Sequence, residues 1–117
     1  MSFHLVWTIE AQTQYEALKA AAEAVHNART RSKKAKAAAK QEGLFKQVHK
    51  CLQLLSANPR HPGLQTHEFH SIEHPYNRGA KVFEAYAQHR TPGAYRVFWC
   101  YGPDKGDLTI IAITPHP

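Results

Sequence analysis

The sequence predicts an α+β domain: an N-terminal strand and a helical hairpin, followed by four antiparallel strands, form one five-stranded sheet packed on the helices. Between residues 13 and 55 the apolar side chains recur at helical spacing. From residue 64 onward they fall into short runs separated by turn residues, as in consecutive strands. A chain of 117 residues supports one core but not two. We therefore expect one domain over residues 1–117.

The first elements are expected to be a strand over residues 2–10 and a helix from Thr13. Along the strand, apolar and other side chains alternate, which is the period of a strand with one buried face. The alternating apolar set is Phe3, Leu5, Trp7 and Ile9. Thr13 and Glu16 have the spacing of a capping box, which predicts the start of the helix. Its apolar positions are Leu18, Ala21, Ala22, Val25 and Ala28.

A second helix is expected where large apolar residues return at helical spacing. Its apolar stripe consists of Leu44, Val48, Cys51, Leu52 and Leu55. Pro59 and Pro62 prevent its continuation. Much of the positive charge lies between the two stripes, in residues 29–50. This basic segment is either a solvated helix face or a surface for an anion, and residues 29–43 either prolong the first helix or turn back.

Four strands are expected in the remainder, at residues 64–72, 81–88, 94–101 and 108–114. The turn sequences PYNRG, HRTPG and GPDKG separate them. Short turns join antiparallel neighbours, so one face of the resulting sheet is expected to pack on the helical pair. The core between sheet and helices is expected to contain Trp7, Leu52, Leu55, Val97, Trp99 and Ile111.

Composition favours an anionic partner. The net charge is +6 and nine histidines add to it as the pH falls. Nucleic acid or an acidic protein would satisfy these electrostatics. No apolar run is long enough to cross a membrane and no secretory signal is readable, so the cytoplasm is the expected location. Cys51 and Cys100 lie in apolar contexts without metal-binding spacing and are expected to be reduced thiols.

Several motifs together resemble the RelE/ParE superfamily of bacterial toxins over nearly the whole chain. They are HEFH at residues 67–70, VFEAY at 82–86, AYRVFW at 94–99 and TIIAITPHP at 109–117. The resemblance implies a five-stranded sheet and an acidic antitoxin as partner. It also implies either cleavage of messenger RNA on the ribosome or, in the ParE branch, inhibition of DNA gyrase.

Arg96 lies in an otherwise apolar strand, and alternation explains how such a strand accommodates a cation. Arg96, Phe98 and Cys100 point one way, whereas Tyr95, Val97, Trp99 and Tyr101 point the other. The second set forms the face toward the helices, so Arg96 is expected on the opposite face. The resemblance implies that the matching arginine holds the scissile phosphate, a role suited to a planar guanidinium. The alternative is a structural ion pair with Glu84.

Metal-independent cleavage of RNA also needs a base and an acid, and histidine suits both. The candidates are His67, His70 and His116; the resemblance implies the last, although the tyrosine that often accompanies it is absent. Regular strand geometry would put His67 and His70 on opposite faces. Glu84 stands where related ribonucleases often carry lysine, and it is either a general base or the partner of Arg96.

Substrate contacts are expected from cations and aromatic rings near these groups. Lys81 and Arg78 could contact phosphates, although exposed cations are common in turns. Tyr86 and Phe98 could stack on a base. A zinc site built from His67, His70, His74 and His116 is the less favoured interpretation, and we expect no metal and no cofactor. The alternative function is a non-catalytic interaction module, either a gyrase inhibitor or a degenerate toxin.

Overall fold

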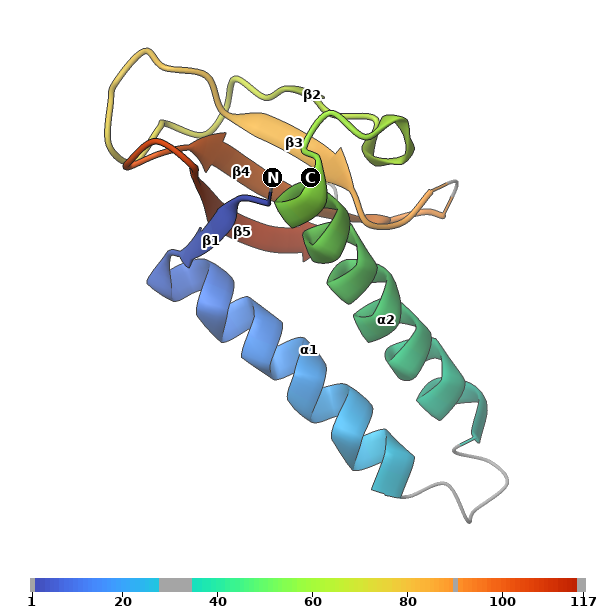
Figure 1. The fold of residues 1–117 in the computed structure, drawn as a ribbon. Coiled ribbons are helices and arrows are strands. Elements are labelled where there is room, and N and C mark those ends of the chain that lie inside the picture. Colours follow the sequence, from blue (N-terminus) through green and yellow to red (C-terminus); the bar gives the residue numbers. More distant parts are fainter. Residues whose placement is uncertain (1, 28–34, 90, 116–117) are drawn as a thin grey trace.

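The computed structural model describes residues 2–27, 35–89 and 91–115, and it forms one sheet with two long helices (Figure 1). The elements in chain order are β1 (His4–Trp7), α1 (Ile9–Asn27), α2 (Ala35–Ala57), the 3₁₀ turn η1 (Pro62–Leu64), β2 (His67–Glu68), β3 (Phe83–Tyr86), β4 (Tyr95–Tyr101) and β5 (Asp107–Pro115). Both helices lie on the same side of the sheet (Figure 1). The predicted α+β class is confirmed.

The five strands are ordered β1-β5-β4-β3-β2. The last four strands of the chain pair antiparallel with their neighbours, as predicted. β1 instead runs parallel to β5, with Leu5 opposite Leu108 and Trp7 opposite Ile110. The sheet is therefore mixed, and the first strand in the chain pairs with the last strand in the chain.

The first helix begins four residues earlier than the capping box predicted. α1 starts at Ile9, whose side chain is 87% exposed, so Ile9 belongs neither to the strand nor to a buried face. Thr8 supplies the cap: its Oγ1 accepts a hydrogen bond from the Ala11 amide and donates one to the Ile111 carbonyl. Thr13 therefore lies inside the helix.

The second helix contains the predicted apolar stripe and also part of the basic segment that precedes this stripe. α2 runs from Ala35 to Ala57, so residues 35–43 turn back as part of this helix rather than prolonging α1. Val48, Cys51, Leu52 and Leu55 are all buried, and Leu44 packs against them. The chain leaves the helix just before Pro59. Ala28 and the basic residues 29–34 lie outside the described part of the chain, as does the side chain of Val25.

The sheet has a core on each face. Val97, Trp99, Ile110 and Ile113 pack against the buried stripe of α2, as their alternation predicted for the β4 pair. On the opposite face a smaller cluster contains Val82, Phe98, Cys100, Ile111 and Ala112, covered by Phe69 and Ile72. The outer face is thus partly closed by the segment that follows β2.

Two predicted core positions are wrong. Ile111 is buried in the outer cluster and not between sheet and helices. The register slips between Phe98 and Trp99, because Phe98 faces Ala112 whereas Trp99 faces Ile110. The extra residue of this bulge reverses the alternation expected around it. Trp7 is only half-buried, since it packs at the margin of the helix-facing core.

The predicted strand over residues 64–72 is almost entirely irregular. Pro62–Leu64 forms the η1 turn, and only His67 and Glu68 pair with β3. Gln65, with φ 48°, adopts a left-handed conformation that ends η1 and interrupts any continuous strand. Phe69 then packs over Phe98 on the outer face of the sheet, with ring centroids 4.7 Å apart.

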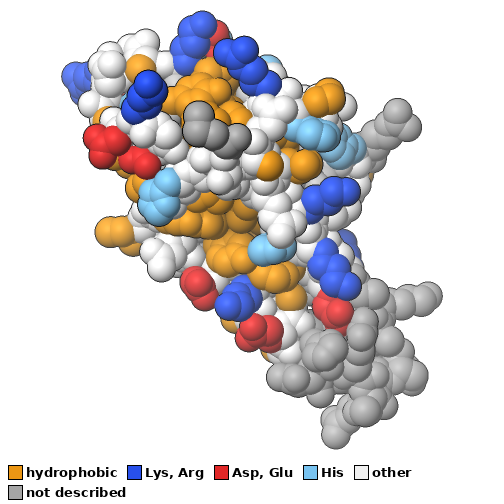
Figure 2. Space-filling view, in the orientation of Figure 1, with side chains coloured by type: hydrophobic (Ala, Val, Ile, Leu, Met, Phe, Trp, Pro, Cys, Tyr) orange, Lys and Arg blue, Asp and Glu red, His pale blue; other side chains and the backbone are white. Residues whose placement is uncertain are grey.

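An apolar surface remains open beside β1. A cavity of about 390 Å³ there is lined mainly by Leu5, Trp7, Tyr15 and Leu52. Figure 2 shows hydrophobic side chains gathered over the region between the two helices and β1. Among the described residues, neither helix is long and apolar enough to span a membrane.

Candidate functional site

His67, Glu84 and Arg96 form a contiguous row on the sheet face that points away from the helices. The Glu84 side chain is 1% exposed, and its Oε1 lies 2.6 Å from His67 Nε2. Its Oε2 lies 3.9 Å from Arg96 Nε. One buried carboxylate therefore contacts a histidine and an arginine from two other strands. This cluster is called the His67–Glu84–Arg96 row below.

Strand register explains why these residues meet. His67 of β2 is directly opposite Glu84 of β3. Two residues further along β3, Tyr86 is directly opposite Arg96 of β4. Side chains of directly opposed residues lie on the same face, as do those two apart on one strand. The four side chains consequently share one face.

Arg96 is enclosed and has several partners. It is 8% exposed, and its guanidinium carbon lies 3.7 Å from the centroid of the Tyr86 ring. Nη1 donates to the Gln88 carbonyl at 3.0 Å and approaches the Tyr95 carbonyl at 3.4 Å. Nε is buried without a hydrogen bond, although it faces Glu84. The ion pair proposed from the sequence is present, and it leaves little of the guanidinium open to a ligand.

His67 lies between two acceptors and is still accessible. Its Nδ1 is 3.1 Å from the Gln65 carbonyl, while Nε2 faces the Glu84 carboxylate. A neutral imidazole can donate to only one of them, whereas an imidazolium donates to both. The side chain is 47% exposed. This ring is therefore held at a fixed position with one side open to solvent, which suits a group that transfers protons.

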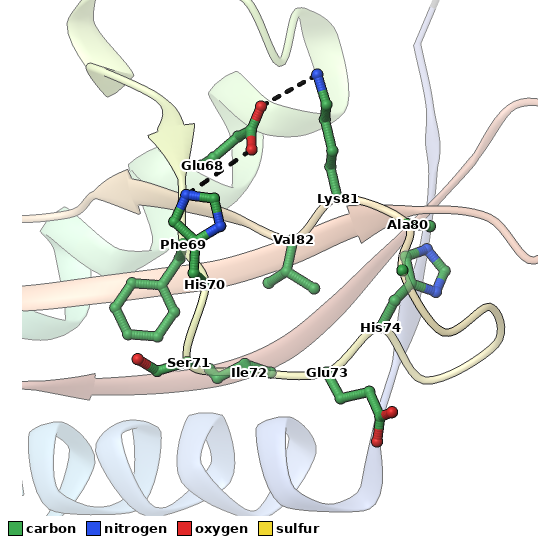
Figure 3. Close-up of a pocket in the computed structure, with 11 residues that line it drawn as sticks. Glu68, Phe69, His70, Ser71, Ile72, Glu73, His74, Ala80, Lys81 and Val82 are labelled. Carbon is green, nitrogen blue, oxygen red and sulfur yellow. Dashed lines mark ion pairs between the residues drawn. The ribbon is translucent and has the colours of Figure 1, made fainter.

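Lys81 and His70 lie apart from the row, where they line a separate cavity of about 430 Å³ (Figure 3). Lys81 Nζ lies 3.0 Å from Glu68, and His70 approaches the same carboxylate at 3.9 Å. Arg78 Nε lies 2.6 Å from Glu73. Two carboxylates, Glu68 and Glu73, line the cavity together with Lys81, so it carries little net positive charge.

The two predicted stacking residues differ in what they can contact. Phe98 is 2% exposed and lies under Phe69, with ring centroids 4.7 Å apart, so it has no open face. Tyr86 is half-buried and contacts Arg96, His67 and His89. His116 lies outside the described residues. Its neighbour Pro115 is opposite Tyr95, and Thr114 is opposite Arg96, so β5 leads past the row.

The histidines of the zinc interpretation have separate roles. His74 accepts hydrogen bonds at Nδ1 from the amides of Tyr76 and Asn77 and donates from Nε2 to the Tyr101 carbonyl. His67 is bound to Glu84, and His70 faces Glu68. Within the described ranges, no three His, Cys, Asp or Glu side chains are grouped so as to hold a metal ion.

Sequence reasoning missed the residues that support the row. Gln88 follows β3, and its carbonyl accepts from Arg96 while its side chain accepts from the Tyr95 amide. Gln88 also donates to Gln47 of α2, which links the helix to the end of the strand. No local pattern marks a glutamine for this role, because it depends on strand register and on the helix packed beside it.

Comparisons with known proteins support the fold. No family model matches the sequence, and no curated protein matches it. Among solved structures, a YoeB/ParE toxin from Agrobacterium tumefaciens is similar, with a TM-score of 0.57. The similarity covers 97% of this chain and 98% of that chain at 12% sequence identity. The chain therefore has the fold of the RelE/ParE superfamily, as its motifs predicted.

Proposed function

We propose that this chain is the toxin of a toxin–antitoxin pair and that it cleaves messenger RNA without a metal ion. The observation that carries the proposal is the His67–Glu84–Arg96 row on the sheet face opposite the helices. Histidine, carboxylate and arginine supply the proton transfer and charge stabilisation that cleavage by a 2′-hydroxyl requires. The shared fold with a YoeB/ParE toxin supports the same class.

Each member of the row has a distinct role in this proposal. His67 moves a proton at the reacting oxygen, because its ring is accessible. Glu84 orients that ring and is too enclosed to meet the substrate directly. Arg96 stabilises negative charge on the phosphate, which requires the phosphate to replace part of its contact with Glu84. His116 remains a proposed second proton-transfer group.

A second candidate is a non-catalytic toxin-like module, including a gyrase inhibitor. The enclosure of Arg96 favours it, since the guanidinium already contacts Glu84, Tyr86 and the Gln88 carbonyl. In that case the row serves only stability. Altering the row is expected to abolish RNA cleavage in the first candidate and to lower only stability in the second. Variants of the row therefore distinguish the two candidates.

The test compares His67→Gln with His70→Gln. The two histidines are three residues apart, but only His67 contacts Glu84. If His67 transfers a proton, His67→Gln lowers the rate of RNA cleavage about 100-fold or more, whereas His70→Gln leaves it near wild type. Cleavage of ribosome-bound messenger RNA and of free RNA is followed with primer extension, and thermal unfolding checks that both variants fold.

Arg96 variants complete the test. Arg96→Lys is expected to cleave poorly even when folded, because an ammonium lacks the planar fork. Wild-type protein that slows growth without cleaving RNA favours the non-catalytic candidate. Equal cleavage by wild type and His67→Gln removes the proposed role of the row.

An acidic antitoxin is the proposed partner, and we place the pair in the cytoplasm, where messenger RNA is translated. The net charge of +6 favours an acidic partner. The apolar cavity beside β1 offers such a protein a surface to cover. Charge would then speed association, and apolar burial would hold the complex.

A further inference from the structure

The two cavities on either side of η1 share a chemical character, because basic and aromatic side chains line both. One, of about 450 Å³, lies between α2 and the end of β3 and is lined in part by Lys50, His61, Tyr86 and His89. The other, of about 390 Å³, is lined in part by Arg60, His61, Phe83 and Tyr101. His61 belongs to both, so the cavities adjoin at η1.

Neither cavity has a carboxylate among its lining residues. The cavity in Figure 3 differs, because Glu68 and Glu73 line it and Glu68 pairs with both Lys81 and His70. The groove beside β1 differs in another way, since its lining is mainly apolar. Uncompensated positive charge next to aromatic rings is the combination that single-stranded nucleic acid requires.

The side chains of these cavities present donors and ring faces. His61 Nδ1 accepts from the Gly63 amide at 3.0 Å, so in the neutral ring the hydrogen is on Nε2, which can donate to a ligand. Tyr101 is 40% exposed although it is a large aromatic residue. Cys51 also borders the first cavity, but burial raises its pKa to about 12, so it adds no negative charge there.

The cavities also adjoin the candidate site. Tyr86 lines the first cavity, and the same ring contacts Arg96 at 3.7 Å and His67 at a centroid distance of 5.7 Å. The His89 ring lies 5.5 Å from it. Tyr86 therefore joins the row to the first cavity, and His61 joins the first cavity to the second, whose residue Tyr101 belongs to the helix-facing side of the sheet. An RNA strand that occupied all three would pass around the β3 edge of the sheet at η1.

We propose that the two cavities flanking η1 bind a single RNA strand next to the scissile nucleotide. Lys50, His61 and Arg60 contact its phosphates, and Tyr101 stacks on a base. The inference rests on the proposed function, because it assigns a further part of the same substrate. It identifies the surface by which RNA binds, separately from the row that reacts.

Binding is measured by fluorescence anisotropy with a labelled RNA oligonucleotide that carries 2′-O-methyl groups, which prevents cleavage. The double variant Lys50→Met/Arg60→Met is compared with Lys19→Met/Lys46→Met. Both remove two positive charges, but the control positions are exposed on the helices and line neither cavity. The test variant is expected to weaken binding at least tenfold more than the control.

Salt dependence gives a second measurement. Each phosphate contact to a single strand contributes about 0.7 to the slope of log K against log salt concentration. The test variant is expected to lower this slope by about 1.4, and the control variant to change it much less. Tyr101→Leu is expected to weaken binding roughly tenfold without changing the slope, because it removes stacking and no charge.

The outcomes distinguish this inference from the proposed function. Wild-type protein that binds the oligonucleotide through Lys50 and Arg60 but fails to cleave normal RNA supports the inference and refutes the proposed ribonuclease activity. Cleaving protein whose test and control variants bind RNA equally overturns the inference alone. If the test variant binds RNA as the wild type does but no longer captures the antitoxin, the inference is also overturned. Adenosine monophosphate that competes as well as the oligonucleotide would mean a mononucleotide pocket and would overturn the strand assignment.

Discussion

Glu84 is expected to be the residue whose loss most disturbs the outer face of the sheet. The change Glu84→Gln keeps the shape of the side chain and removes its charge. Glu84 is 1% exposed and Arg96 is 8% exposed, so the substitution leaves a guanidinium buried without its counter-charge. Breaking a buried pair in this way typically costs about 3–5 kcal/mol.

The expected value lies at the lower end of that range, at about 3 kcal/mol, because Arg96 keeps other partners. Nη1 still donates to the Gln88 carbonyl, and Tyr86 still covers the guanidinium. Arg96→Met should cost less, about 2 kcal/mol, since Glu84 keeps its contact with His67 and the buried Nε loses no hydrogen bond. The double variant should cost about 2 kcal/mol less than the sum of the two.

The assay is urea unfolding at neutral pH, followed by tryptophan fluorescence, for the wild type, both single variants and the double variant. Thermal midpoints should fall by roughly 4 °C per kcal/mol for a domain of this size. Free energies that add within about 0.5 kcal/mol would mean that Glu84 and Arg96 do not interact. That result would refute the ion pair as a source of stability and would leave Arg96 free for a phosphate.

Three other outcomes are expected. Trp99→Ala should cost about 3–5 kcal/mol in urea unfolding, since Trp99 is 1% exposed in the helix-facing core; a loss below about 1 kcal/mol would contradict that packing. Burial raises the pKa of Cys51 from 9.0 to about 12 and that of Cys100 to about 11, so their stabilising effect is complete below pH 9 and is lost as the pH rises through these values. The urea midpoint of Cys51→Val should therefore fall less steeply above pH 9 than that of the wild type, and parallel curves would speak against this linkage. An acidic protein encoded beside the gene should be captured in co-expression with an affinity that weakens as salt rises; no capture even at low salt would remove the antitoxin proposal.

Alternation along a strand was enough to predict where Arg96 and Trp99 point. Each lies in a seven-residue strand with a clear period of two, and their opposite environments follow from it. The pairing of Arg96 with Glu84 could also be predicted, because the two adjacent strands each carry one charge among apolar residues. The sequence could not show that His67 is opposite Glu84, since β2 is only two residues long.

The wrong predictions have causes that a periodic pattern does not reveal. The bulge in β5 moves Ile111 to the outer face, although its neighbours alternate regularly in sequence. The helix start was assigned to the capping box at Thr13, but Thr8 follows a strand directly and caps the helix through tertiary contact with Ile111. In both cases the deciding contact comes from a distant segment of the chain.

The parallel pairing of β1 with β5 has a consequence for how the chain folds. The hydrogen bond from Thr8 to Ile111 spans 103 residues, whereas the β3–β4 and β4–β5 pairs join strands that are close in sequence. Closing so long a loop costs entropy before the contact compensates for it, and this favours early formation of the β3–β4–β5 meander. During synthesis, β1 and the two helices have no sheet to pack on until residues 107–115 have been made. A nascent chain therefore cannot assemble the complete five-stranded sheet until β5 has left the ribosome.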